Sequence, residues 1–169
     1  MKIEIKIHPN FSRKMKIAFY KKLGAIEDFL IRWHTREKKW WIFSLAKYSH
    51  CELVFSNGEF FSSSGRDGGV RFKKIKSDEK KWDFFEIKIS AENEKKVREF
   101  CEAQIGKKYD WRAIIFSQLF ELNRENSKKW FCSEICAAAL QRVGFLKNEK
   151  PHLLSPNELF VALRRDEVL

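Results

Sequence analysis

The spacing of apolar residues changes near Ser90, and this change constrains the fold more than any other feature of the sequence. Before Ser90, short segments alternate apolar and polar residues, as Phe85 and Ile87 alternate with Glu86 and Lys88, a pattern typical of half-buried strands. After Ser90, apolar residues recur at helical spacing. Strands followed by helices predict an α+β fold, with an antiparallel sheet or small barrel packed against helices.

Turn residues divide the first half of the chain into candidate strands. Ser56, Asn57 and Gly58 tolerate positive φ and predict a hairpin, and the glycine-rich stretch 65–69 predicts a second tight turn. A helix is expected over residues 25–33 and a loop or irregular insertion over residues 35–47. The candidate strands are residues 16–20, 50–55, 59–62, 70–73 and 82–89. An extension of the helix over 25–33 is the alternative for the first of them.

Capping residues mark the helices of the second half. Ser90 is a good N-cap, and with Glu92 in the first turn it predicts a helix that ends at Gly106. Further helices are expected over residues 110–122 and 132–143, the latter stopped by Gly144. The dipeptide Ser155-Pro156 predicts the start of the last helix, because serine caps and proline is tolerated in the first turn.

Length and composition predict a single domain, residues 1–169, without repeats or linkers. The net charge of +11 attracts anionic partners, but the basic residues are scattered, so specific nucleic-acid binding is not expected. The start of the chain alternates charge with isoleucine, and the apolar runs are short. We therefore expect no signal peptide or membrane span, and a cytoplasmic chain as synthesised, whose four cysteines are free thiols.

His50 and Glu52 are the first candidate functional residues. Residues two apart in a strand point to the same face, so His50 and Glu52 are expected side by side, with Cys51 on the opposite face. A carboxylate beside an imidazole holds its tautomer and stabilises the imidazolium, as a general base requires. A strand whose polar face simply meets solvent explains the same spacing.

Cys132 is the candidate nucleophile, because it stands at the predicted start of a helix. Unpaired N–H groups and the helix dipole favour a thiolate there. Cys136 and Leu140 follow at helical spacing, so the stripe that begins with Cys132 should face the sheet and aim the thiol at the strand of His50. Two alternatives stay open: Cys132 and Cys136 as small core residues, or a zinc site made from both cysteines, His50 and a fourth ligand.

Four short segments together resemble a known family. They are Tyr48-Ser-His-Cys-Glu-Leu-Val-Phe55, Phe61-Ser-Ser-Ser64, Gly106-Lys-Lys-Tyr-Asp-Trp111 and Phe131-Cys-Ser-Glu-Ile-Cys136. In this order they resemble the permuted branch of the NlpC superfamily of papain-like cysteine peptidases, in particular YiiX-like proteins, in which the histidine also precedes the cysteine. A weaker resemblance extends to lecithin retinol acyltransferase-like enzymes.

The resemblance implies a permuted papain-like fold and a catalytic triad. Cys132 is then the nucleophile, His50 the base and Glu52 the group that orients it, while Tyr109 lies near the site and contributes to substrate binding. Ser64 and Arg66, close to the hairpin, are further candidates for substrate recognition. No metal and no cofactor is expected.

The function implied is hydrolysis of an amide through a thioester, on a peptide substrate such as a peptidoglycan stem peptide. Two alternatives accompany it. One is a lipid acyl hydrolase or transferase that the basic surface draws to anionic membranes. The other is a binding module without enzymatic activity.

Overall fold

The computed structural model describes residues 14–21, 47–110 and 129–169. Within these ranges the chain forms a seven-stranded sheet in the order β5-β1-β2-β3-β4-β6-β7. Neighbouring strands are antiparallel except β6 and β7, which are parallel. The elements are β1 (Lys16–Tyr20), β2 (His50–Val54), β3 (Phe60–Ser64), β4 (Gly69–Lys73), β5 (Trp82–Glu86), α2 (Ala91–Glu102), β6 (Lys108–Tyr109), β7 (Lys129–Trp130), α4 (Cys132–Gln141), the 3-10 helix η1 (Pro151–Leu153) and α5 (Pro156–Arg165).

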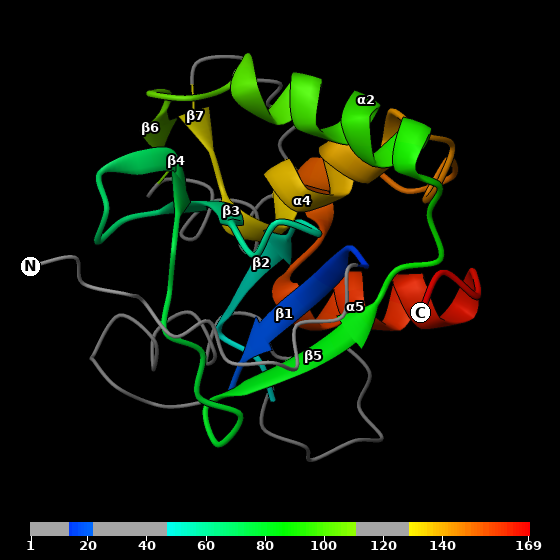
Figure 1. Ribbon diagram of the computed structural model, residues 1–169, viewed down its shortest axis with the longest axis horizontal. Helices are drawn as coiled ribbons and strands as arrows, with labels where there is room; N and C mark the ends of the chain where they lie inside the picture. The colour runs from blue at the N-terminus through cyan, green and yellow to red at the C-terminus, as the bar shows by residue number, and fades with distance from the viewer. Residues whose placement is uncertain (1–13, 22–46, 111–128) are drawn as a thin grey trace, which may run out of the picture.

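The helices α2, α4 and α5 pack on one face of this open sheet (Figure 1). The prediction of an α+β fold with a mainly antiparallel sheet is therefore confirmed, and the sheet is open rather than a closed barrel. The short strands β6 and β7 were not predicted. Two residues are too few to show a periodicity, and these strands arise from pairing between distant segments.

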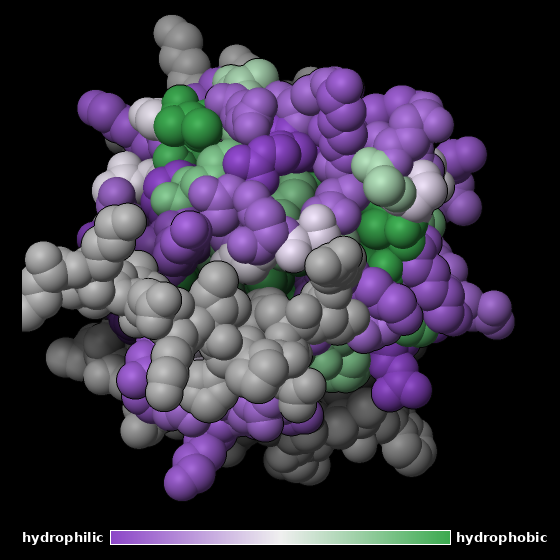
Figure 2. All heavy atoms as spheres, viewed as in Figure 1, coloured by the Kyte–Doolittle hydropathy of each residue, from purple (hydrophilic) through white to green (hydrophobic). Residues whose placement is uncertain are grey.

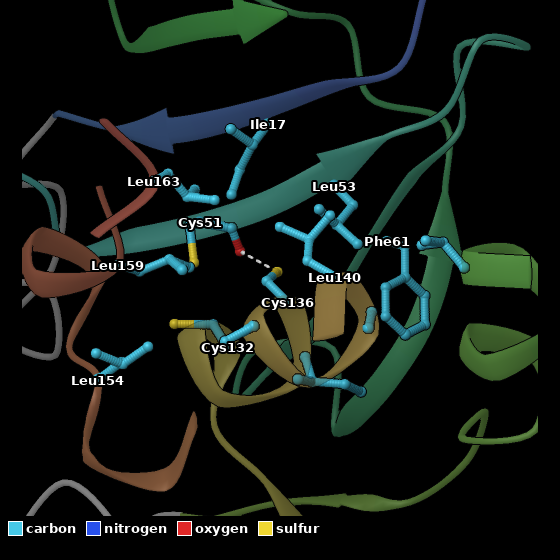
Figure 3. Packing of buried hydrophobic residues seen from close by; sticks show 14 of the residues in the cluster. Ile17, Cys51, Leu53, Phe61, Cys132, Cys136, Leu140, Leu154, Leu159 and Leu163 are labelled. Carbon is cyan, nitrogen blue, oxygen red and sulfur yellow. Dashed lines mark hydrogen bonds between the residues drawn. The ribbon is translucent and has the colours of Figure 1, made fainter. Parts of the chain in front are cut away.

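Alternation along the strands separates two clusters of apolar side chains. Ile17, Leu53 and Phe61 point toward the helices, where they meet Leu140 of α4 and other side chains of one large core (Figure 3). Each such fully buried side chain contributes about 1.5–3 kcal/mol to folding. The opposite face carries a smaller cluster, made of Ala18, Val54, Phe60 and Trp82. His50 and Glu52 belong to this second face by the same alternation.

The predicted hairpin is confirmed between β2 and β3. The Phe55 N–H donates to the Glu59 carbonyl at 2.9 Å, and Gly58 takes a φ of 82°, a conformation that glycine adopts without a steric penalty. The second turn lies between β3 and β4 and ends at Gly69. A Cβ atom at Gly69 would lie 2.1 Å from the Lys107 carbonyl oxygen, so the close approach of β4 to β6 requires glycine.

The helix after Ser90 ends at Glu102, and the prediction that it reaches Gly106 is wrong. Its start is as expected, since Ser90 Oγ accepts from the Asn93 N–H at 3.2 Å. Residues 103–106 form turns instead, and the Gly106 N–H donates to the Val70 carbonyl at 3.1 Å. Pairing with β4 therefore takes the backbone group that a longer helix would have used.

Two other boundaries differ from the prediction, and one agrees. Helix α4 ends at Gln141 rather than residue 143, although Gly144 still follows it with a φ of 91°. Strand β5 ends at Glu86 rather than residue 89, and the Ile87 N–H donates to the Met15 carbonyl. Helix α5 begins after Ser155, whose hydroxyl caps it as predicted. The helix expected over 25–33, nearly all of the loop over 35–47 and the helix over 110–122 beyond Asp110 lie outside the described residues.

The described residues on the face that Figure 2 shows are mainly hydrophilic, with hydrophobic spots between them. The large apolar side chains that are most exposed among the described residues are Ile105, Leu153 and Val161. Within the same ranges, every helix is too short or too polar to cross a membrane.

Candidate active site

Cys132 is the first residue of α4, as the sequence predicts, and its surroundings fix the start of that helix. Phe131 is the extended N-cap residue, and its N–H donates to Glu134 Oε2 at 3.2 Å. The Ser133 hydroxyl donates to the Leu154 carbonyl at 2.5 Å. These bonds hold the first turn, whose N–H groups and dipole favour negative charge on the Cys132 sulfur.

His50 and Glu52 lie side by side on β2, as the alternation predicts. His50 Nε2 is 3.1 Å from Glu52 Oε1. The His50 side chain is 18% exposed and that of Glu52 is 2% exposed, so the pair is largely shielded from water. Because Nε2 faces the carboxylate, Nδ1 is the ring nitrogen left for the sulfur of Cys132.

The start of α4 meets β2 where β2 and β3 separate. The pairing of these strands covers only Leu53 with Phe61 and Val54 with Phe60. Beyond that point, the Ser62 hydroxyl donates to the Cys51 carbonyl at 2.8 Å, and the Ser63 hydroxyl donates to the Trp130 carbonyl at 2.8 Å. At this point hydrogen bonds from serine side chains replace backbone pairing. They join β3 to β2 and to the segment that leads into Cys132.

The electrostatics of the site favour a thiolate paired with an imidazolium. Burial by itself lowers the pKa of His50, but the negative charge and hydrogen bond of Cys132, together with Glu52, raise it to about 10. Burial by itself raises the pKa of Cys132, but a hydrogen bond from Cys51 and the charge and hydrogen bond of His50 lower it to about 5. Both shifts favour the ion pair of thiolate and imidazolium at neutral pH.

Cys51 takes part in the site although it points to the opposite face of β2 from His50. That face is covered by α4, and the sulfurs of Cys51, Cys132 and Cys136 gather between the strand and the helix (Figure 3). Burial and hydrogen bonds to the other two thiols raise the pKa of Cys51 well above its usual value, so it stays protonated and donates. Sequence reasoning placed Cys51 correctly but gave it no role.

Arg71 is the residue of the site that sequence reasoning missed. It lies on β4, and its guanidinium donates to both oxygens of Glu52, from Nη1 at 2.9 Å and from Nη2 at 2.8 Å. Burial by itself raises the pKa of Glu52, but hydrogen bonds from His50 and Arg71 hold it below its usual value. The sequence gave no local signal for this contact, because the two residues stand on different strands.

Glu134 adds a second carboxyl close to Cys132. Burial and the charge of Asp110 raise the pKa of Glu134 to about 7, against the effect of its bond from the Phe131 N–H. A pKa near 7 lets this carboxyl change its charge near neutral pH, in the first turn of the helix that carries Cys132. It belongs to the Cys-Ser-Glu segment of the sequence, where its position alone predicted no role.

The three predicted binding residues occupy different places. Tyr109 is buried in β6, with its ring centroid 5.8 Å from that of Phe131, and so lies beside the residue that precedes Cys132. Ser64 ends β3 and is largely buried, whereas Arg66 is exposed in the following turn. Asp67 of this turn accepts a hydrogen bond from Arg71. A role for Ser64 and Arg66 in binding substrate stays a prediction.

The chemistry of this arrangement is that of an activated thiol. All four cysteines are free and buried. Among the residues that the structure describes, there is no group of three or more His, Cys, Asp or Glu side chains that could hold a metal ion, so the zinc alternative gains no support from them. A thiolate, a histidine and an orienting carboxylate can instead carry out nucleophilic attack and proton transfer.

Comparisons with known proteins add no relative. No protein-family model matches the chain, and neither the curated proteins nor the solved structures gave a significant match.

Proposed function

We propose that this chain is a thiol-dependent hydrolase with a permuted papain-like fold, which cleaves amide bonds through a thioester on Cys132. The observation that carries the proposal is the pairing of Cys132, at a helix N-terminus, with a histidine that is itself bound by a buried carboxylate. Burial alone would leave a thiol protonated and inert. A pKa of about 5 gives a nucleophile that is ready at neutral pH.

The reaction follows from the positions of these groups. The Cys132 sulfur attacks the amide carbonyl, and N–H groups of the first turn of α4 stabilise the oxyanion. His50 donates its proton to the leaving amine, and the thioester remains on Cys132. His50 then takes a proton from water, the hydroxide attacks the thioester, and the acid product leaves as the thiolate re-forms.

The substrate class proposed is a peptide amide, with peptidoglycan stem peptides as the first candidates. Cys132 is 0% exposed, so a substrate reaches the sulfur only if the atoms that cover it move. A small electrophile is therefore the best first probe. Iodoacetamide alkylation of Cys132, followed by mass spectrometry across pH, should show an inflection near 5, far below that of an ordinary thiol at about 8.5.

Turnover is tested with peptidoglycan fragments and peptide amides. Cys132→Ala should abolish cleavage while changing the melting temperature little, because alanine is well accommodated at the start of a helix. Cys136→Ala is the matched control, since it removes the buried thiol one turn further along α4 and leaves Cys132 in place. Full activity in Cys132→Ala would rule out the mechanism.

A lipid acyl substrate is the second candidate, and the net charge of +11 is the observation that favours it. The same thiolate can attack an ester carbonyl. Such an enzyme should co-sediment with anionic vesicles at low salt and release them as salt is raised. No binding at low salt would remove this candidate and leave the amide substrate.

A further inference from the structure

Arg71 connects the candidate triad to the turn between β3 and β4. It is paired with Ser62 of β3 in register and reaches across that strand to Glu52 of β2. Both carboxylate oxygens are bound, at 2.9 and 2.8 Å. Two parallel bonds fix the plane of the carboxylate as well as its position, which a single bond does not do.

The guanidinium is itself held from the other side. Its Nε donates to Asp67 Oδ2 at 2.7 Å, and Asp67 Oδ1 accepts from Lys73 Nζ at 2.8 Å. The Arg71 side chain is only 16% exposed. Glu52 is thus held by a group that has little freedom to move, because Asp67 in the turn between β3 and β4 holds the guanidinium in place.

We propose that Arg71 is a positioning residue of the hydrolase, which acts on Cys132 through Glu52 and His50. The inference rests on the proposed function, since it assigns a role within the same site. Lysine could supply the charge but not the planar fork that binds two oxygens at once. The role therefore requires arginine in particular.

The balance of buried charges is the physical reason why Arg71 should affect the titration of Cys132. In the active form Cys132 and Glu52 are negative, and His50 and Arg71 are positive, so the buried set is neutral. Without Arg71 it carries a net negative charge in a place with little water, and it relieves that charge by taking up a proton. Among the described residues, the other titratable or charged groups near the set include Asp67, Lys73, Cys51, Cys136, Glu134 and Tyr20, the last paired in register with His50.

The experiment measures the pH at which Cys132 alkylation by iodoacetamide is half-maximal, in the full chain. Arg71→Met should move this midpoint upward by about 1 pH unit or more. Arg71→Lys keeps the charge and loses the second bond, so its midpoint should lie between those of wild type and Arg71→Met. Circular dichroism and the melting temperature report whether each variant is folded.

Arg98→Met is the matched control. Arg98 also joins two carboxylates, Glu59 at 2.8 Å and Glu102 at 2.9 Å, but it does so from α2 and without contact to Glu52. Its loss should lower the melting temperature and leave the Cys132 midpoint unchanged. A purely structural role for Arg71 would give the same result in Arg71→Met, and this outcome would overturn the inference.

The outcomes separate this inference from the proposed function. If wild-type Cys132 shows no acid-shifted midpoint, the proposed function fails and the role of Arg71 fails with it. If the wild-type midpoint is low and both folded Arg71 variants keep it, only the role of Arg71 is overturned. If Arg71→Met does not fold, Arg71→Lys decides the question, because an unchanged midpoint there also overturns the inference.

Discussion

Cys132 and Cys101 are both completely buried in the same core, yet their environments shift the pKa values of the two thiols in opposite directions. Cys132 is the first residue of α4, whereas Cys101 is next to the last residue of α2. The helix dipole favours a negative sulfur at the first position and opposes it at the second. The pKa of Cys101 is strongly raised, by burial first and then by the nearby Cys136.

The comparison indicates that burial alone does not decide the pKa of a thiol. At Cys101 the desolvation cost of a thiolate is left almost uncompensated, and the thiol stays neutral. At Cys132 the same cost is outweighed by the charge of His50 and by hydrogen bonds from both His50 and Cys51. The pKa of Cys132 thus depends on its partners, and each partner can be removed separately.

Replacement of His50 by alanine should have the largest effect on the difference between the two thiols. Without the imidazolium, the alkylation midpoint of Cys132 should rise from about 5 toward the ordinary thiol value of about 8.5. At pH 5.5 the rate should fall on the order of tenfold, because the thiolate fraction drops steeply while the remaining thiolate is a better nucleophile. Mass spectrometry of the alkylated peptides measures both quantities.

His152→Ala is the control for this experiment, because it removes the other histidine within the described residues. It should leave the Cys132 profile as in wild type. The wild-type profile should also change again near pH 10, where His50 loses its proton. A midpoint that stays near 5 in His50→Ala would mean that the helix and Cys51 alone stabilise the thiolate, and it would contradict the ion pair with His50.

Replacement of Cys51 should have a smaller effect in the same direction. A hydrogen bond to a charged group contributes about 1.5–3 kcal/mol, and about 1.4 kcal/mol corresponds to one pH unit. Cys51→Ala should therefore raise the Cys132 midpoint by about 1 to 2 pH units. Cys51→Ser keeps a donor on the same strand and should stay close to wild type, so an equal shift in both variants would contradict a hydrogen-bonding role.

Local patterns in the sequence predicted the two ends of this site and that Cys132 faces the strand of His50, but not the contacts that Arg71 and Cys51 add. The two-residue period placed His50 beside Glu52, and the helical stripe placed Cys132 at a helix start that faces the sheet. These positions follow from the geometry of one strand and one helix. The triad roles assigned from the resemblance remain predictions that the experiments above test.

The contacts that complete the site join residues far apart in the chain. Arg71 meets Glu52 because β4 lies one strand away from β2 in the sheet, and the long arginine side chain reaches across β3. Cys51 approaches Cys132 because α4 packs against the side of β2 on which Cys51 lies. Periodicity along one element cannot show how the strands of a sheet are ordered, and it therefore could not reveal either contact.

Replacement of Cys101 should have the smallest effect on the Cys132 midpoint, and it tests whether the neutral thiol of the pair influences Cys132. Cys101→Ala removes one buried sulfur, which should lower the free energy of unfolding by about 1 kcal/mol in urea denaturation. Cys101→Ser should cost more, because a buried hydroxyl needs a hydrogen-bond partner that a thiol can do without. Neither variant should move the Cys132 midpoint. If either did, the two thiols would be coupled through Cys136, and the reactivity of Cys132 would no longer depend on its immediate partners alone.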